Sequence, residues 1–459
     1  MPKEPTSYTQ LNLFQSPLRD MLDSKDPLVA LADTIKWDEF EKEFAKYYKN
    51  EKEGRPSKPI RLMVGLLLLK QLENLSDENI VLQWKRNPYY QYFCGMNEYT
   101  PAYPCHSTEL VKFRNRIGTK GVEFIFKSTI QLHGKKSEEK EVIVDTTVQE
   151  KNITYPTDGK LAIKMISKLH KIAKDEKIQL RRTYVREIKQ HRINLRFFKH
   201  PKKIKKAKAS IKRLRTIVGI LIRDISRKLS QDRLDNYQET FTLFEKVSTQ
   251  KPNDKNKIYS LHEQDIYVIA KGKEHKKYEF GTKASIVATK QSGIIIGVVA
   301  HKTNIHDSKT LQEVLTKASQ NRKKPIKEAI CDRGYRGEKE INGITISIPD
   351  TKRKKRDSRY KIEQKRKKFR RRAAIEPIIG HLKSDHRLSR NYLKGFIGDE
   401  INLLLAASAW NLKKWINDFL MFIFMVKLLL FYSLFKELKT NKKEKCSDLI
   451  LALARLVRK

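Results

Sequence analysis

The chain has 459 residues and a formal net charge of +44, because 97 Lys and Arg face 53 Asp and Glu. This length allows a large core in two or three domains, and the positive charge favours a polyanionic partner, nucleic acid first and an anionic membrane surface second. Four widely separated cysteines without zinc-site spacing and the lack of a Walker-type motif argue against disulfides, structural zinc and a nucleotide cofactor.

The first 135 residues are expected to form an all-α N-terminal domain, and its beginning lacks the apolar core of a secretory signal. An apolar helix is predicted over 58–74, and Ser76 is placed to cap a second helix whose first turn holds two acids. Lys85 and Arg86 lie on this second helix. The pair therefore fits either a helix-turn-helix that binds DNA or a plain αα-hairpin.

At Glu141 the periodicity of the sequence changes. The run EVIVDTTVQ is short, β-branched and bounded by polar segments, which predicts a strand over 141–149. Asp145 interrupts the apolar residues in the middle of this strand. A buried carboxylate is costly unless it faces a cleft or binds a cation, so a functional role for Asp145 is favoured.

Residues 159–255 are predicted to be a helical insertion in which cations far outnumber acids. Its densest run, PKKIKKAKASIKRLR, contains four lysines that we expect to contact DNA phosphates: Lys202, Lys203, Lys205 and Lys206. The alternative is a solvated helical hairpin without a partner.

Strand signals return after the insertion. Three β-branched runs between 265 and 302 predict an antiparallel meander. Asp307 or Ser308 could cap the amphipathic helix that follows. A short strand is then expected to end in Asp332, and one more strand is expected over 344–350.

The stretch from 369 to 388 follows a basic segment that we read as a loop or a frayed helix. At helical spacing, one stripe within about 40° carries an aromatic residue, two cations and an acid: Phe369, Arg372, Glu376 and Lys383. Pro377 requires that a helix begin near Ala374 or bend there. A surface amphipathic helix with i,i+4 ion pairs is the alternative to a functional site.

Asp145, Asp332 and Glu376 come from separate elements, so only tertiary structure can bring them together. Clustered carboxylates repel one another, and divalent cations with oxygen ligands, Mg²⁺ above all, relieve that repulsion. Two such ions about 4 Å apart stabilise the entering and leaving oxygens of a phosphoryl displacement. With the cationic surface, the acids predict a metal-assisted nuclease or strand-transfer enzyme on DNA.

Over roughly residues 10–416 the chain resembles the DDE transposases of bacterial insertion sequences. The resemblance rests on IVDTT around Asp145, CDRGY around Asp332, and the R-x3-E-x6-K pattern of Arg372, Glu376 and Lys383. Further stretches that look alike are LENLSDENI, KGKEHKKYEFG and TNIHDS. Phe369 departs from the family pattern, which has tyrosine there, so the ring is kept and the hydroxyl is lost.

The resemblance implies an α/β ribonuclease-H-like catalytic domain over 136–416, a mixed sheet flanked by helices, with Asp145, Asp332 and Glu376 as ligands of two Mg²⁺ ions that Mn²⁺ may replace. Arg372 and Lys383 would contact the transposon ends. The implied reaction is cleavage of double-stranded DNA at the ends of the element, followed by transfer of the 3′-OH into double-stranded target DNA. The resemblance also implies that the enzyme acts as a homodimer. The alternative is a catalytically inactive DNA-binding descendant.

Other side chains receive weaker assignments. Tyr335 and Arg336 could line the site and contact DNA, although a plain turn role is equally open. His381 and His386 are expected to face DNA or solvent rather than to bind metal, and Asp385 is expected to pair with a cation. Three residues match a family stretch and receive no catalytic role: His301, Asn304 and Asp307.

The tail, 417–459, is not explained by the resemblance. Residues 419–435 are apolar except for Lys427, which would lie at the costliest depth of a bilayer. We therefore favour an amphipathic or buried helix, or an oligomer contact, over a membrane span, and expect a cytoplasmic protein. A short basic amphipathic helix is predicted over 449–459, and a basic membrane-associated helical protein is the remaining interpretation.

Overall fold

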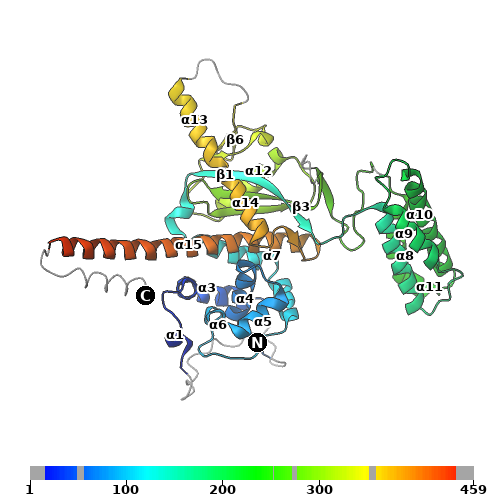
Figure 1. The fold of residues 1–459 in the computed structure, drawn as a ribbon, viewed down its shortest axis with the longest axis horizontal. Coiled ribbons are helices and arrows are strands. Elements are labelled where there is room, and N and C mark those ends of the chain that lie inside the picture. Colours follow the sequence, from blue (N-terminus) through cyan, green and yellow to red (C-terminus); the bar gives the residue numbers. More distant parts are fainter. Residues whose placement is uncertain (1–15, 49–55, 252, 271–276, 351–357, 441–459) are drawn as a thin grey trace.

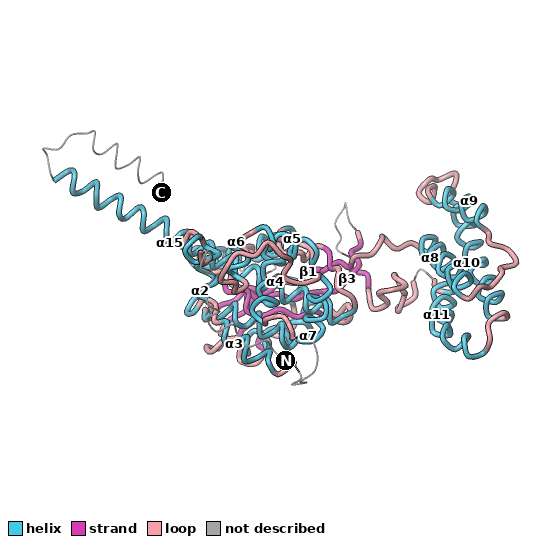
Figure 2. The backbone as a smooth tube through the Cα atoms, turned by 90° about the horizontal axis from the view of Figure 1, so that it is seen from below, coloured by secondary structure: helices cyan, strands magenta, loops and turns pink. Residues whose placement is uncertain are grey.

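The computed structural model describes residues 16–48, 56–251, 253–270, 277–350 and 358–440. A long helix, α15 (Gly395–Thr440), lies between a mixed sheet and a set of N-terminal helices (Figure 1). A separate group of helices projects from one end of the sheet (Figure 2).

The N-terminal region is helical, as predicted. Its helices are α1 (Leu18–Met21), α2 (Pro27–Thr34), α3 (Trp37–Ala45), α4 (Ile60–Leu72), α5 (Asp77–Arg86), α6 (Pro88–Phe93) and α7 (Ser107–Gln131). Helix α4 is buried along nearly its whole length, and the Ser76 hydroxyl accepts a hydrogen bond from the Asn79 amide at the start of α5. The predicted cap is therefore confirmed, whereas the choice between DNA-binding motif and plain hairpin stays open.

Strand β1 (Glu141–Lys151) lies at the centre of the sheet. It pairs antiparallel with β3 (Tyr278–Thr289) and parallel with β5 (Glu328–Ile330), and β7 (Ile344–Ser347) continues the parallel side. The other edge of β3 is shared by β2 (Tyr267–Ala270) and β4 (Ile295–His301). Two short strands complete the sheet: β6 (Glu340–Ile341) beside β7, and β8 (Arg390–Asn391) beside the end of β1.

The predicted strands form, but the expected antiparallel meander is wrong, because β2 and β4 share one edge of β3 and β1 occupies the other. Two smaller corrections concern the end of β5 and the cap of α12. Strand β5 ends at Ile330, two residues before Asp332, which instead caps the 3₁₀ turn η2 (Arg333–Tyr335). Helix α12 (Asp307–Gln320) is capped by the His306 side chain, not by Asp307 or Ser308, because the imidazole accepts a hydrogen bond from the Ser308 amide.

One hydrophobic core joins the N-terminal helices, the sheet and the first part of α15. Helix α15 packs against α4, α7 and β4, and the 3₁₀ turn η1 (Gly134–Glu138) leads from α7 into β1. The two segments expected on either side of residue 135 thus share a core, because α15 presents apolar side chains to both.

The insertion consists of helices, as predicted: α8 (Asp158–Asp175), α9 (Val185–Leu195), α10 (Ile204–Ser226) and α11 (Gln231–Thr249). These helices have a hydrophobic core of their own, which includes Leu169, Leu214 and Phe244. The insertion therefore has the packing of an independent unit, placed between β1 and β2.

The basic segment before the R-x3-E-x6-K pattern is a helix, α13 (Arg359–Arg372), rather than a loop. The chain then breaks at Ala373 and Ala374, and α14 (Ile375–Ser384) begins with Pro377 in its first turn. The first of the two expected alternatives is thus correct, since proline is tolerated in a first helical turn.

Helix α15 runs without interruption through the expected boundary at 416/417. Ile416 is buried, whereas the apolar side chains from Leu420 to Tyr432 are exposed, except Ile423, which is half-buried. Within the described part of the chain, this helix alone is long and apolar enough to cross a membrane, which is weak evidence for a span. The predicted helix over 449–459 lies outside the described residues.

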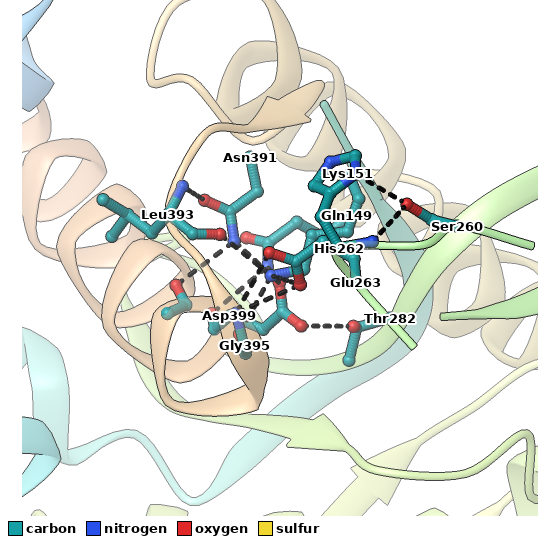
Figure 3. Close-up of polar contacts among 11 residues, drawn as sticks. Gln149, Lys151, Ser260, His262, Glu263, Thr282, Asn391, Leu393, Gly395 and Asp399 are labelled. Atoms are coloured by element: carbon teal, nitrogen blue, oxygen red, sulfur yellow. Dashed lines mark hydrogen bonds and ion pairs between the residues drawn. The ribbon is translucent and has the colours of Figure 1, made fainter. Parts of the chain in front are cut away.

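A buried polar network ties β1 to the start of α15 and to the chain leaving the insertion (Figure 3). Lys151 Nζ lies 2.9 Å from Asp399 Oδ1 and 3.5 Å from Glu263 Oε2, and it donates to two backbone carbonyls. Asp399 also accepts hydrogen bonds from Thr282 and Asn391. Burial raises the pKa of Asp399, while the Lys151 charge opposes that rise.

Candidate active site

The register of the sheet places two acids side by side. In the parallel pair of β1 and β5, Ile143 lies opposite Ile330. Asp145 and Asp332 each follow two residues after this pair, so both emerge in the same direction beyond it. Asp145 Oδ1 accepts a hydrogen bond from the amide of Thr146, and Asp332 Oδ1 accepts one from the amide of Gly334.

Glu376 reaches the same place from the first turn of α14. This helix buries Ile375, Ile378 and Leu382, which fixes it against the core. Since the apolar side chains occupy the other flank, the Glu376 carboxylate stays largely exposed and faces the end of α13.

Arg372 lies at the centre of this arrangement. Its Nη2 is 2.7 Å from Asp145 Oδ2 and 3.7 Å from Asp332 Oδ2, and its Nη1 is 3.5 Å from Glu376 Oε1. One guanidinium group therefore contacts all three acids predicted from the sequence. We call Asp145, Asp332 and Glu376 the acidic cluster.

The donor atoms of the acidic cluster suit a hard divalent cation, because all are carboxylate oxygens and two of the side chains are partly open to solvent. In this structure the three carboxylates surround the Arg372 guanidinium and are spaced accordingly. The described residues contain no group of three or more His, Cys, Asp or Glu side chains that lie close enough together to hold a metal ion.

A fourth acid, Asp307, lies beside the cluster, and the sequence analysis gave it no catalytic role. Its Oδ1 accepts hydrogen bonds from Thr146 Oγ1 at 3.1 Å and from Lys283 Nζ at 3.0 Å. A Cβ added at Gly334 would lie 3.0 Å from Asp332 Oδ1 and 3.6 Å from Asp307 Oδ2. Glycine at 334 thus leaves room for these two carboxylates to approach each other. The sequence drew attention to Asp307 only through the TNIHDS stretch and as a possible cap of the following helix.

Tyr335 does not fit the predicted contact with DNA, since only 1% of it is exposed. Burial, together with the charges of Asp145 and Asp307, raises the pKa of its phenol well above the usual value. The ring packs in the core under the acidic cluster, so the prediction is wrong for Tyr335. Arg336, the next residue, is exposed and remains a candidate.

The two histidines after Glu376 differ from each other. His386 is buried, its Nδ1 lies 3.2 Å from the Gln71 carbonyl, and burial lowers its pKa, so the prediction of a DNA-facing or surface residue is wrong. His381 is exposed as predicted, and its Nδ1 lies 2.8 Å from Asp385 Oδ2. Asp385 accordingly has the cationic partner expected for it whenever His381 is protonated.

The remaining predicted DNA contacts lie on three elements. Phe369 is half-buried at the base of α13, against the main core, and Lys383 is half-buried on α14. The four lysines of the insertion are exposed around the start of α10, apart from the acidic cluster (Figure 1): Lys202, Lys203, Lys205 and Lys206.

Comparisons with known proteins give two family matches. Residues 16–116 match the family described as "Transposase domain (DUF772)", and residues 247–412 match the "Transposase DDE domain". The second match includes Asp332 and Glu376, and Asp145 precedes it.

The chain is also similar to "Uncharacterized protein ORF8 in nfe locus" of Rhizobium meliloti. The two are 35% identical over 204 residues, which is 43% of this chain and 97% of that protein. No solved structure matches the chain.

Proposed function

Because the chain belongs to the insertion-sequence DDE transposases, whose function is DNA transposition, we propose that the acidic cluster of Asp145, Asp332 and Glu376 is its catalytic centre. The DDE domain implies a ribonuclease-H-like fold, and the mixed sheet with flanking helices agrees with it. The observation that supports the proposal most directly is that all three acids contact one guanidinium.

Members of this family generally use divalent metal ions. We propose that the acidic cluster holds two Mg²⁺ ions, which Mn²⁺ can replace. Such ions, when bound, stabilise the entering and leaving oxygens of a phosphodiester displacement. The carboxylates of β1, of the turn after β5 and of α14 would supply the protein ligands.

The proposed reaction has two displacements at phosphorus. Water attacks a phosphodiester at the end of the element, the P–O3′ bond breaks, and the leaving oxygen takes a proton to give a 3′-OH. This hydroxyl then attacks a target phosphodiester, so that one P–O bond forms as another breaks and the released target 3′ oxygen takes up a proton. Each step exchanges one P–O bond for another, and no nucleotide is consumed.

Cationic side chains around the acidic cluster are the proposed DNA contacts. Arg372 and Lys383 flank Glu376 along the chain, and a guanidinium binds phosphate through paired hydrogen bonds. Arg336 is exposed four residues after Asp332, and the half-buried Phe369 can offer a ring face for stacking on a base. The lysines at the start of α10 would contact phosphates farther along the duplex.

We propose that three parts of the chain have different functions. Residues 1–135 form the helical DNA-binding part, residues 136–416 form the catalytic part with its insertion at 159–255, and 417–459 form a tail. A cytoplasmic homodimer bound to double-stranded DNA is the proposed working form. Nothing in the described residues or the family matches favours a catalytically inactive descendant.

The proposal is tested by incubating purified protein with the flanking DNA ends of its element and Mg²⁺, and by mapping nicks on both strands. Asp332→Asn is expected to abolish cleavage while retaining DNA binding, because it removes one carboxylate charge and little volume. Glu363→Gln is the matched control, since Glu363 is an exposed acid on α13 away from the cluster. Cleavage retained in Asp332→Asn would reject the proposed centre.

A further inference from the structure

The position of Arg372 bears on when a metal ion can enter the acidic cluster. The side chain is only 15% exposed, and its two terminal nitrogens face the three acids. It thus occupies the space toward which the carboxylates point. A cation brought there from solvent meets a positive charge that the protein itself provides.

The backbone that carries Arg372 is held firmly. Arg371 donates hydrogen bonds to the carbonyls of Lys290 and Gln291, and Lys368 pairs with Glu328 and donates to Ser347. These contacts anchor the last turn of α13 to the sheet. A change in the position of the Arg372 guanidinium therefore needs rotation about side-chain bonds only, without movement of the helix.

The guanidinium is not fully satisfied where it lies. Its Nε is buried and has no hydrogen-bond partner among the described residues. A buried donor without a partner is unfavourable, so the contact with the acids leaves part of the bonding capacity of Arg372 unused. A phosphate oxygen pair could engage Nε and Nη2 together, because the planar fork of arginine matches such a group.

We propose that Arg372 is the counter-ion of the acidic cluster in DNA-free protein, and that a divalent cation and the Arg372 guanidinium compete for the same carboxylates. A DNA phosphate that binds the guanidinium draws it away from the acids and opens the cluster to metal. DNA and metal therefore bind cooperatively, and by linkage each raises the affinity for the other by the same factor. This inference rests on the proposed function of the acidic cluster.

Removal of the guanidinium has opposite consequences under the two views of Arg372. If it were only a structural partner of the acids, its loss would disorder the cluster and weaken metal binding. If it competes with metal, its loss strengthens metal binding in the absence of DNA. The sign of the change therefore decides between the views.

The experiment measures Mn²⁺ binding to the full chain by electron paramagnetic resonance, with and without a DNA duplex. Arg372→Gln is expected to raise Mn²⁺ affinity without DNA about tenfold, within the usual range of coupling between sites. Arg372→Lys keeps the charge without the fork and should give a smaller increase. Arg370→Gln, an exposed neighbour on α13, is the matched control and should leave the affinity unchanged.

The duplex is expected to raise Mn²⁺ affinity in the native protein but not in Arg372→Gln. Unchanged or weaker Mn²⁺ binding in Arg372→Gln and Arg372→Lys would overturn the inference and leave the proposed function intact.

Asp145→Asn provides the separate test of that function, because Mn²⁺ binding that is insensitive to this change would place the metal elsewhere. Melting temperatures, measured with and without Mn²⁺, supply a second readout: Arg372→Gln should gain more from Mn²⁺ than the native chain.

Discussion

Replacing His301 with glutamine is expected to flatten the acid side of the stability profile of this protein. His301 lies in β4, is almost completely buried, and its Nε2 is 2.8 Å from Ser285 Oγ. Burial lowers the pKa of the imidazole from 6.5 to about 4, and the nearby Lys283 charge adds to this effect. Glutamine can keep a hydrogen bond to Ser285 without titrating.

The sign follows from where the protons bind. Between pH 6.5 and about 4 the unfolded chain protonates His301 and the folded chain does not, so the free energy of unfolding falls as the pH falls. The stabilisation is complete above pH 6.5. One pKa unit corresponds to about 1.4 kcal/mol. This histidine alone should therefore lower the free energy of unfolding by about 2 kcal/mol between pH 7 and pH 5, and by about 3 kcal/mol once the pH lies well below 4.

The assay is urea denaturation at pH 7, 6 and 5, followed by tryptophan fluorescence. The tryptophans lie in the N-terminal helices and α15, so the signal reports on the main core and not on the insertion. His301→Gln should lose about 2 kcal/mol less than the native chain over this range. Parallel pH profiles for His301→Gln and the native chain would refute the reasoning.

Two further predictions concern the polar network and the insertion. Lys151→Met should lower the free energy of unfolding by about 3–5 kcal/mol, because Glu263 and Asp399 would then be buried without their cation; a decrease below about 1 kcal/mol in the same urea assay would contradict this. A second variant replaces four lysines of the insertion by alanine: Lys202, Lys203, Lys205 and Lys206. The slope of log DNA affinity against log salt concentration should become shallower by about 0.9 for each phosphate that the variant no longer binds. An unchanged slope would exclude these lysines as DNA-binding residues.

Local patterns were enough to predict most elements and the three acids. The short β-branched run EVIVDTTVQ predicted β1, the serine cap predicted the start of α5, and Pro377 limited where α14 could begin. These signals depend on residues within one or two turns of each other, and tertiary packing reinforced them.

The role of Arg372 could not be predicted in the same way. A helical wheel placed it on a stripe with Glu376, which left a functional site and a surface amphipathic helix as alternatives, whereas the structure directs its guanidinium to all three acids. Its partners Asp145 and Asp332 meet it only through the register of β1 with β5. Register depends on contacts between distant segments, so it could not be predicted from the local sequence pattern.

The burial of Tyr335 and His386 was missed for a related reason. Both side chains combine an apolar ring with a polar tip, so their composition fits a core as well as a surface. Only the packing of the turn after β5 and of the chain after α14 determines which of the two applies.

The position of the insertion explains how so much positive charge coexists with an acidic centre. The chain leaves the sheet after Lys151 and returns near Glu263, and the ion pair between these two residues closes the insertion at its base. Closure at the base lets a large inserted unit fold on its own core without disturbing the sheet. Asp145 lies on the same strand as Lys151, so β1 connects the cationic unit directly to the acidic cluster. A duplex held by the insertion would thus be positioned through β1 relative to the acids that we propose as the catalytic centre.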